Sequence, residues 1–393
     1  MRTRVAIIGS GPAGLLLAQL LDQAGIESVI VERQSAEHVK SRIRAGILES
    51  ASVELLREAG VGERLDREAI EHRGIYLQWP GERRHLDFTE LTGRSVYVYG
   101  QTDLTADLMA ARDRAGQLAF YQVSDVELHD VETDRPAITF TDSEGVSRRV
   151  DADVIVGCDG YHGPSKQAIP ERVRQTWERA YPFAWLGVLA QVPPSTDELI
   201  YAWHPDGFAL HSMRSDQVSR FYLQVDPAER IEDWSDERIW AELAKRLELD
   251  GWTLNTGPII EKSVLPMRSF VTAPMRHGRL FLAGDAAHIV PPTGAKGLNL
   301  AIADVAVLAR ALSALLLDGS TELADAYSET ALRRVWRCTH FSWWMTTMLH
   351  RHGDDFDAAL QLSQLRRVAD SPTAAKELAE NYAGLPILGG GRG

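Results

Sequence analysis

The glycine-rich segment near the start of the chain has the residue types of a dinucleotide-binding loop. Gly9, Gly11 and Gly14 follow the apolar run 5–8 in a G-x-G-x-x-G pattern and precede a helix-like run of leucines. The glycines permit a tight turn and the close approach of a pyrophosphate, and Glu32, about twenty positions on, can bind ribose hydroxyls. The whole pattern of strand, loop, helix and acidic residue predicts a dinucleotide site, but Glu32 alone does not choose between FAD and NAD.

A second stretch with chemical potential lies between residues 279 and 308. The apolar strand 280–282 leads to Asp285, a Pro/Gly loop covers 291–294, and a helical pattern begins at 297–299. A carboxylate at the end of a strand, beside the free N–H groups of a helix N-terminus, suits sugars, phosphates and electron-rich rings. The alternative interpretation is an ordinary strand–loop–helix connection.

The segment from 33 to 45 is dense in cations. It includes Arg33, Arg42 and Arg44 directly after the dinucleotide pattern. Most charge runs are solvated surfaces. The position after a dinucleotide motif favours a phosphate-facing role at least equally.

A pair of strands in the middle of the chain carries polar side chains that could recognise an acid. Residues 207–214 and 219–225 alternate as a hairpin does, which places Ser212 with Arg214, and Arg220 with Tyr222, on one face. Arginine is suited to two-pronged recognition of a carboxylate. The competing interpretation is a set of exposed cross-strand residues on a solvated sheet face.

These stretches must be positioned by a mixed α/β fold. Continuous apolar strands at 5–8, 28–31 and 150–156 favour a parallel, Rossmann-like sheet, whereas 72–99 and 181–265 show the alternation of antiparallel strands. Helices are expected at 49–60, 103–115, 235–247, 299–317, 322–350 and 356–382. We therefore expect a discontinuous FAD-binding domain (1–71, 100–180, 268–300), an inserted antiparallel β-sheet substrate domain (72–99, 181–267), a C-terminal helical region (301–388) and a disordered tail (389–393).

Composition narrows the class of protein. The chain has 393 residues and a net charge of −13, which argues against a nucleic-acid or anionic-membrane partner. Its two cysteines, Cys158 and Cys338, lack metal-type spacing, so no metal site is expected and the cytoplasm is the expected location. We also expect no membrane-spanning segment.

Three separated elements together resemble the single-component FAD-dependent aromatic hydroxylases. They are GSGPAG with Glu32, CDGYHGPSK at 158–166 and GDAAHIVPPTGAKGLN at 284–299. The likeness extends over almost the whole chain, through RIRAGILE at 42–49, VYGQT at 98–102, HFSWWM at 340–345 and ENYAGLP at 380–386.

The resemblance implies roles for individual residues. FAD would be bound by Gly9, Gly11, Gly14, Glu32, Arg42, Arg44, Gln101, Asp159, Asp285, Leu298 and Asn299. The substrate would be bound by Ser212, Arg214, Arg220, Tyr222, Tyr201, Pro292 and Thr293. The catalytic set would be Tyr201, Tyr382, His72, Pro292 and Asn299, with the two tyrosines passing a phenol proton to His72 as the outlet to solvent. The nicotinamide coenzyme would meet His162, Arg268 and Arg33.

The implied activity is hydroxylation of 4-hydroxybenzoate to 3,4-dihydroxybenzoate with O2 through a flavin C4a-hydroperoxide, in a homodimer. The co-substrate would be NADPH or NADH, because Arg33 and Gln34 match the NADPH-specific pattern while His38 departs from it. The alternatives are hydroxylation of a related benzoate, such as 3,4-dihydroxybenzoate or 4-aminobenzoate, and a flavoprotein that binds an aromatic acid without turnover.

Overall fold

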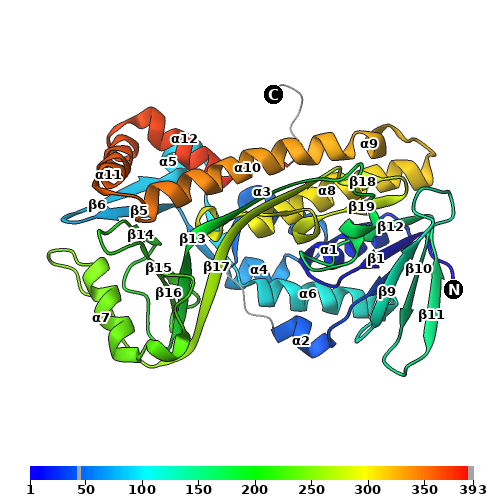
Figure 1. Ribbon diagram of the computed structural model, residues 1–393, viewed down its shortest axis with the longest axis horizontal. Helices are drawn as coiled ribbons and strands as arrows, with labels where there is room; N and C mark the ends of the chain where they lie inside the picture. Colours follow the sequence, from blue (N-terminus) through cyan, green and yellow to red (C-terminus); the bar gives the residue numbers. More distant parts are fainter. Residues whose placement is uncertain (42–45, 388–393) are drawn as a thin grey trace.

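A parallel sheet organises one lobe of the computed structural model, which describes residues 1–41 and 46–387 (Figure 1). Its strand order is β18-β19-β12-β1-β2-β8, and all neighbours run parallel except β18 and β19. The strands are β1 (Val5–Ile8), β2 (Ser28–Val31), β8 (Ala119–Phe120), β12 (Val154–Gly157), β18 (Arg276–His277) and β19 (Leu280–Leu282). Every residue of β1, β2 and β12 is buried, as expected for strands covered on both faces. The Rossmann-like expectation is confirmed.

A three-stranded antiparallel sheet adjoins this lobe. It consists of β9 (Ser124–His129), β10 (Ala137–Thr141) and β11 (Ser147–Asp151). The predicted single strand 150–156 is wrong, because the chain leaves β11 after Asp151 and enters β12 only at Val154. At the break, buried Ala152 lies between the partly buried Asp151 and Asp153, so the continuous apolar run begins only at Val154.

An eight-stranded sheet forms the second lobe, in the order β20-β17-β13-β16-β15-β14-β5-β6. All neighbours are antiparallel except β14 and β5. The strands are β5 (Gly74–Trp79), β6 (Glu82–Asp87), β13 (Gln175–Ala190), β14 (Ile200–Ala202), β15 (Ala209–Met213), β16 (Ser219–Val225), β17 (Ile259–Ala273) and β20 (His288–Ile289). The predicted hairpin is confirmed as β15 and β16. The long strands β13 and β17 are each continuous across the expected domain boundaries at 180/181 and 267/268.

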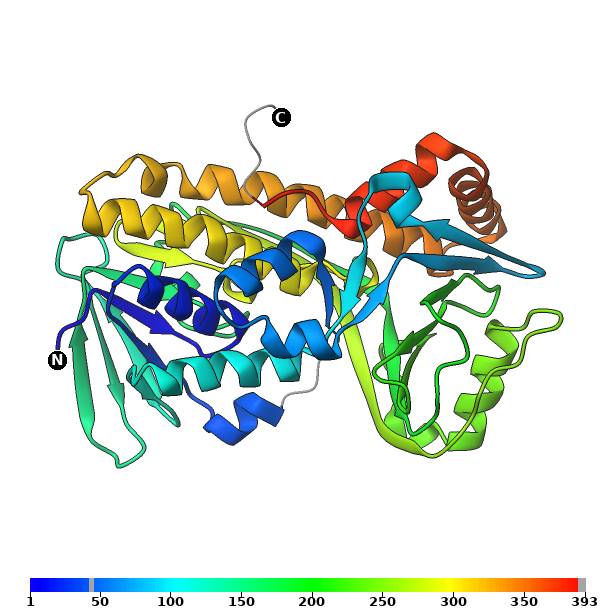
Figure 2. The ribbon, with the colours of Figure 1, turned by 180° about the vertical axis from the view of Figure 1, so that it is seen from behind.

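A small third sheet joins the lobes. Its order is β3 (Ile47–Glu49), β7 (Val96–Val98) and β4 (Ile70–His72). The sequence placed 96–98 with the strands 75–79 and 84–88, but a short helix, α5 (Phe88–Thr92), intervenes and diverts β7 to β3 and β4. Figure 2 shows this region from behind.

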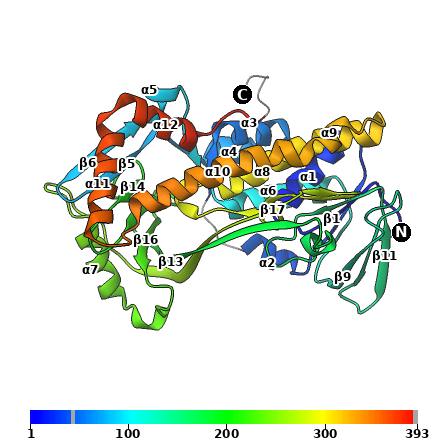
Figure 3. The same cartoon turned by 45° about the horizontal axis from the view of Figure 1, so that its top comes forward.

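Helices cover the sheets. Two long ones, α8 (Gly297–Leu317) and α10 (Tyr327–Leu349), pack against each other, and α10 extends over both lobes (Figure 3). By length and a mean hydropathy of 2.1, α8 could cross a membrane, but 61% of its apolar window is buried within the protein, where it packs against α1 (Pro12–Gln23). The others are α2 (Ala36–Ser41), α3 (Ser50–Glu58), α4 (Glu63–Glu68), α6 (Gln101–Arg114), α7 (Asp236–Arg246), α9 (Glu322–Asp325), α11 (Asp355–Asp370) and α12 (Pro372–Ala383).

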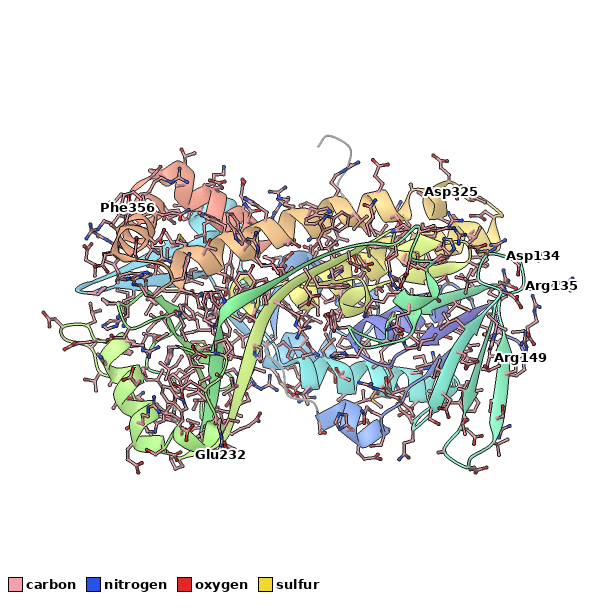
Figure 4. All side chains as sticks on the ribbon, in the orientation of Figure 1. Asp134, Arg135, Arg149, Glu232, Asp325 and Phe356 are labelled. Carbon is pink, nitrogen blue, oxygen red and sulfur yellow. The ribbon has the colours of Figure 1, made fainter. Side chains whose placement is uncertain are left out.

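The predicted continuous helix 356–382 is wrong. The chain breaks at Ser371, whose hydroxyl accepts the N–H of Ala374, and Pro372 begins α12. Proline suits the first turn of a helix but cannot continue the preceding one. The preceding helix, α11, lies at the end of the molecule, where Phe356 is 71% exposed (Figure 4).

Candidate active site

The residues assigned to the dinucleotide lie along one edge of the parallel sheet. Four neighbouring strands run in the same direction, so the segments that follow them meet at their carboxyl ends. This places Gly9, Glu32, Asp159 and Asp285 along one edge of the sheet.

The three glycines of the loop have different surroundings. Gly9 has φ +104°, and a Cβ there would overlap the carbonyl oxygen of Cys158. A Cβ on Gly14 would overlap the carbonyl oxygen of Gly9. A Cβ added to Gly11, by contrast, would meet no protein atom within 4 Å, which leaves this face of the loop open to a ligand. Gly9 and Gly14 therefore allow the loop to close, and Gly11 gives access to it.

Two carboxylates fit a bound nucleotide. Glu32 accepts the N–H groups of Ser10 and Gln34 at 2.8 and 2.9 Å, one on each oxygen, and Oε2 also accepts the Ser10 hydroxyl at 3.3 Å, so that Oε1 can accept a further bond. Asp159 accepts the N–H of Ser165 at 2.8 Å through Oδ2, while its buried Oδ1 has no partner among the described residues. Burial raises the pKa of Asp159. An unpaired buried oxygen beside the glycine loop fits a hydroxyl-bearing cofactor such as FAD.

The N-terminus of α8 is fixed by side chains that sequence reasoning assigned only in part. Asn299 Oδ1 accepts the N–H of Glu49 at 2.9 Å and the hydroxyl of Ser52 at 2.7 Å, and its Nδ2 donates to the carbonyl oxygen of Ile47 at 2.8 Å. The side chain of Asn299 thus ties β3 and α3 to α8, which leaves its backbone N–H for the predicted contact with the cofactor. Gln101, at the start of α6, and Leu298 lie where the sequence placed them in these elements.

A buried ion pair beside Asn299 was missed by the sequence analysis. Lys296 Nζ lies 2.8 Å from Glu49 Oε1 and donates to the carbonyl oxygen of Tyr382 at 2.7 Å; both charged side chains are at most 2% exposed. Arg334 holds the other oxygen of Glu49 at 3.1 Å. The network connects α8 to the carboxyl end of α12. The GAK sequence before the helix was the only available signal, and Glu49 lies 247 positions away.

Two tyrosines meet at the centre of the second lobe. The hydroxyls of Tyr201 and Tyr382 are 2.6 Å apart, and each residue is 1% exposed. Burial raises the pKa of both phenols. In this environment the hydroxyls remain protonated and can pass a proton by exchanging donor and acceptor roles.

The strand register brings the predicted substrate residues to the same face. Leu210 lies opposite both Tyr201 and Tyr222, and Ser212 lies opposite Arg220. Residues directly opposite in a sheet point to one side. The predicted common face of Ser212, Arg220 and Tyr222 is therefore confirmed, and Tyr201 shares it.

Arg214 continues this face and has a partner that the sequence did not predict. Its Nη2 lies 2.8 Å from Asp103 Oδ2, and Asp103 Oδ1 is held by Arg64 at 2.8 Å. The guanidinium lies against Gly100, where a Cβ would overlap it. Asp103 thus orients Arg214 while Arg64 balances the carboxylate.

The loop between the two candidate sites is attached to α10. Thr346 Oγ1 lies 2.6 Å from the carbonyl oxygen of Ser342 and 2.9 Å from Thr293 Oγ1. A carbonyl oxygen only accepts, so Thr346 donates to Ser342 and Thr293 donates to Thr346. Pro292, the neighbour of Thr293, is exposed.

His72 lies at a different depth from the one expected. It is 0% exposed, burial lowers its pKa, and neither ring nitrogen has a partner among the described residues. The residue after it is connected to Tyr382 through Phe88: Arg73 O accepts the N–H of Phe88 at 2.6 Å, and the Phe88 ring lies 5.0 Å from the ring of Tyr382. His72 does not itself reach solvent, contrary to the expectation of a direct outlet.

The three residues assigned to the nicotinamide coenzyme do not all lie in one place. Around the Tyr161 ring lie His162 at 4.9 Å, Lys166 at 4.5 Å and Arg268 at 4.8 Å. Lys166 and Arg268 give this cluster two positive charges, which suits phosphate. Arg33 is exposed after β2, and Arg42 and Arg44 fall outside the described residues.

Comparisons with known proteins agree with this geometry. Residues 2–342 match the family described as "FAD binding domain". The p-hydroxybenzoate hydroxylase of Acinetobacter baylyi is 53% identical over 98% of this chain and 96% of its own. The solved p-nitrophenol 4-monooxygenase of Pseudomonas putida has a TM-score of 0.81 at 19% identity, over 98% of this chain and 99% of its own. OxyS anhydrotetracycline hydroxylase of Streptomyces rimosus has a TM-score of 0.76 at 23% identity, over 98% of this chain and 76% of its own. At these identities the two structures show the fold alone.

Proposed function

Because this chain belongs to the FAD-binding family of single-component aromatic hydroxylases, we propose that it hydroxylates 4-hydroxybenzoate to 3,4-dihydroxybenzoate with O2 and NAD(P)H. The observation that carries the proposal is the buried Tyr201–Tyr382 pair on the same sheet face as Ser212 and Arg220, followed by Arg214. An acid-binding arginine at one end and a proton-accepting phenol at the other match a benzoate with a para hydroxyl group.

The substrate carboxylate is held by Arg214, Ser212 and Tyr222. Arg214 already donates to Asp103 through Nη2, and a guanidinium has five N–H donors, so others are available to a ligand. Arg220, 9% exposed, adds a second buried positive charge on the same face. These contacts fix the ring and set the phenolic oxygen towards Tyr201.

Tyr201 takes up the proton of the substrate phenol, and Tyr382 carries a proton onward. A ring bearing phenolate is a better nucleophile than one bearing phenol, so removal of this proton prepares the ring for attack. The buried tyrosines and Thr293 also keep water from the reacting atoms. Bound FAD, once reduced, supplies an electrophilic oxygen atom from O2.

The cofactor is held by the edge of the parallel sheet and by α8. Gly11 would leave room for the pyrophosphate, Glu32 and Asp159 would accept hydroxyls, and the backbone N–H groups of 297–299 would donate to the electron-rich ring. The helix N-terminus stabilises negative charge there.

The test is a coupled assay on the purified holoprotein. It should be yellow, and 4-hydroxybenzoate should accelerate flavin reduction and yield 3,4-dihydroxybenzoate, with NADPH and NADH compared side by side. A panel including 3,4-dihydroxybenzoate and 4-aminobenzoate should give lower initial rates. An unchanged rate of flavin reduction, with no dihydroxy product, would refute the proposal.

We also propose that the protein is a cytoplasmic homodimer. Both cysteines are free, and the charge of −13 suits a soluble protein. Light scattering of the purified holoprotein should give about twice the chain mass of 43.6 kDa. A monomer mass would refute the assembly.

A further inference from the structure

The enclosure of His72 raises the question of where a proton leaves the protein. Tyr201 and Tyr382 are each 1% exposed and His72 is 0% exposed. A proton that reaches His72 therefore needs a further group before it meets water. Both ring nitrogens of His72 are without a partner among the described residues, so they are available to such a group.

Glu198 lies beside the backbone that follows His72. Its Oε1 accepts the N–H groups of Arg73 at 2.6 Å and Gly74 at 2.9 Å. Burial lowers the pKa of His72, and the nearby carboxylates of Glu198 and Asp197 act in the opposite direction. A carboxylate next to a buried imidazole favours its protonated form and can exchange a proton with it.

His85 connects this carboxylate to the surface. Its Nε2 lies 2.6 Å from Glu198 Oε2, and its side chain is 37% exposed whereas that of Glu198 is only 9% exposed. The two oxygens of Glu198 thus have different surroundings: Oε1 is bonded to the backbone beside His72, and Oε2 is bonded to a ring that reaches solvent.

We propose that Glu198 and His85 carry the substrate's phenolic proton from His72 to solvent, an inference that rests on the proposed hydroxylation of 4-hydroxybenzoate. The O–H bond of the phenol breaks, its electron pair stays on the phenolate oxygen, and one proton enters the Tyr201–Tyr382 pair. His72 then takes a proton, Glu198 receives it, and His85 releases one to water. No electron is transferred, and one proton leaves for each substrate bound.

The surrounding groups are consistent with this direction. Burial disfavours protonated His72, whereas Glu198 and Asp197 favour it. His72 is thus a transient carrier rather than a resting place for the proton. The other titratable or charged groups facing the route are Tyr76 of β5, Arg83 of β6 and His211 of β15.

A structural role for Glu198 is the competing explanation, since its bonds to Arg73 and Gly74 hold the turn between β4 and β5. The test therefore centres on His85, which is partly exposed and whose loss leaves both backbone bonds in place. The matched control is His277, whose Nε2 also lies 2.6 Å from a carboxylate, that of Glu132, at the edge of the other lobe.

The experiment is stopped-flow mixing of oxidised holoprotein with 4-hydroxybenzoate in weak buffer with a pH indicator. His85→Gln should slow proton release by about tenfold or more, since positioned proton-transfer groups typically contribute about 10²–10⁴-fold. Substrate affinity, measured by the flavin spectrum, should not change, and His277→Gln should behave as the unmodified protein. Added imidazole should restore the rate in His85→Ala but not alter His277→Ala.

Each remaining outcome decides against the proposal. Unchanged proton release in His85→Gln would overturn this inference alone, whatever the rate in Glu198→Gln, because Glu198 also holds the turn between β4 and β5. Slow release in His85→Gln that imidazole does not restore in His85→Ala would assign His85 a structural role and also overturn it. If the unmodified holoprotein binds 4-hydroxybenzoate without releasing a proton, the proposed function fails as well.

Discussion

The hydroxyl oxygens of Tyr201 and Tyr382 lie 2.6 Å apart although 181 positions separate the residues in the chain. Tyr201 comes from β14 in the eight-stranded sheet, and Tyr382 comes from the last turns of α12. The position of Tyr382 is set by Lys296, which binds its carbonyl oxygen from the N-terminus of α8. The same lysine therefore borders the candidate flavin site and the phenolic end of the substrate site.

Replacing Tyr201 with phenylalanine should separate coenzyme oxidation from hydroxylation. Tyr201→Phe removes the hydroxyl that receives the phenol proton, so the substrate ring stays poorly activated and the O2 that the holoprotein consumes should be released as hydrogen peroxide. We expect substrate-stimulated NAD(P)H oxidation to persist while hydroxylation slows by about 10²-fold or more. Product and peroxide are measured in the same reaction.

The control for this variant is Tyr181→Phe. Tyr181 is also buried, and its hydroxyl bonds Ser269 at 3.0 Å in the same sheet. The Tyr181→Phe variant should hydroxylate 4-hydroxybenzoate at the normal rate. Full coupling in Tyr201→Phe would remove Tyr201 from the mechanism.

Replacing Arg214 with alanine should weaken binding of the acid specifically. Loss of a charge-assisted hydrogen bond costs about 2 kcal/mol, which is about 30-fold in affinity. The neutral 4-hydroxybenzamide should bind the unmodified protein weakly and Arg214→Ala about equally, because it has no carboxylate to lose. Both affinities are read from the flavin spectrum. Equal weakening for the acid and the amide would show that Arg214 only shapes the pocket.

Alanine substitutions at Gly14 and Gly11 should affect stability and FAD binding differently. In Gly14→Ala the new Cβ meets the carbonyl oxygen of Gly9, so the melting temperature should fall with and without added FAD. In Gly11→Ala no protein atom lies within 4 Å, so the melting temperature without FAD should change little, while FAD retention falls. Thermal melts at several FAD concentrations separate the two. Normal FAD retention by Gly11→Ala would mean that the pyrophosphate does not pass this residue.

Acid should destabilise the protein through its buried histidines. Burial lowers the pKa of His350 to about 3, with Trp185 donating to its Nε2 at 2.6 Å. The unfolded value is near about 6.5, so the unfolded chain takes up a proton first as the pH falls. The stabilisation from neutral His350 is thus complete above about pH 6.5 and is lost progressively towards pH 3.

The measurement is urea unfolding of the FAD-saturated protein at about pH 7.5 and about pH 5. The linkage slope is about 1.4 kcal/mol per pH unit. Over this interval the free energy of unfolding of His350→Gln should therefore fall by about 2 kcal/mol less than that of the unmodified protein. His129→Gln, at a partly exposed position, should not alter the difference. The same pH dependence in His350→Gln and the unmodified protein would contradict the assignment.

Local sequence was enough to predict the parts of the site that lie on consecutive residues. Gly9, Gly11 and Gly14 form a loop between a strand and a helix, so their spacing carries the geometry directly. The face shared by Ser212, Arg220 and Tyr222 follows from period-two alternation in a hairpin.

Contacts between distant segments could not be predicted in this way. Asp103 and Arg214 are 111 positions apart and Lys296 and Glu49 are 247 apart, and each looks like an ordinary surface charge in its own segment. The position of His72 likewise depends on the third sheet, in which β4 pairs with β7, a strand that α5 separates from β6. The break before α12 could have been predicted from Ser371-Pro372, a pair of residues typical of a helix start.

The ribbon formed by β13 and β17 connects the two proposed binding regions. Its register shifts between Ala180 and Ala184, where the ladder loses its regular hydrogen bonds. A bulge of this kind bends the strand and increases its local twist. The orientation of one lobe relative to the other is therefore set in part at Tyr181 and Phe183, which lie between Ala180, the partner of Arg268, and Gly187, the partner of Tyr222.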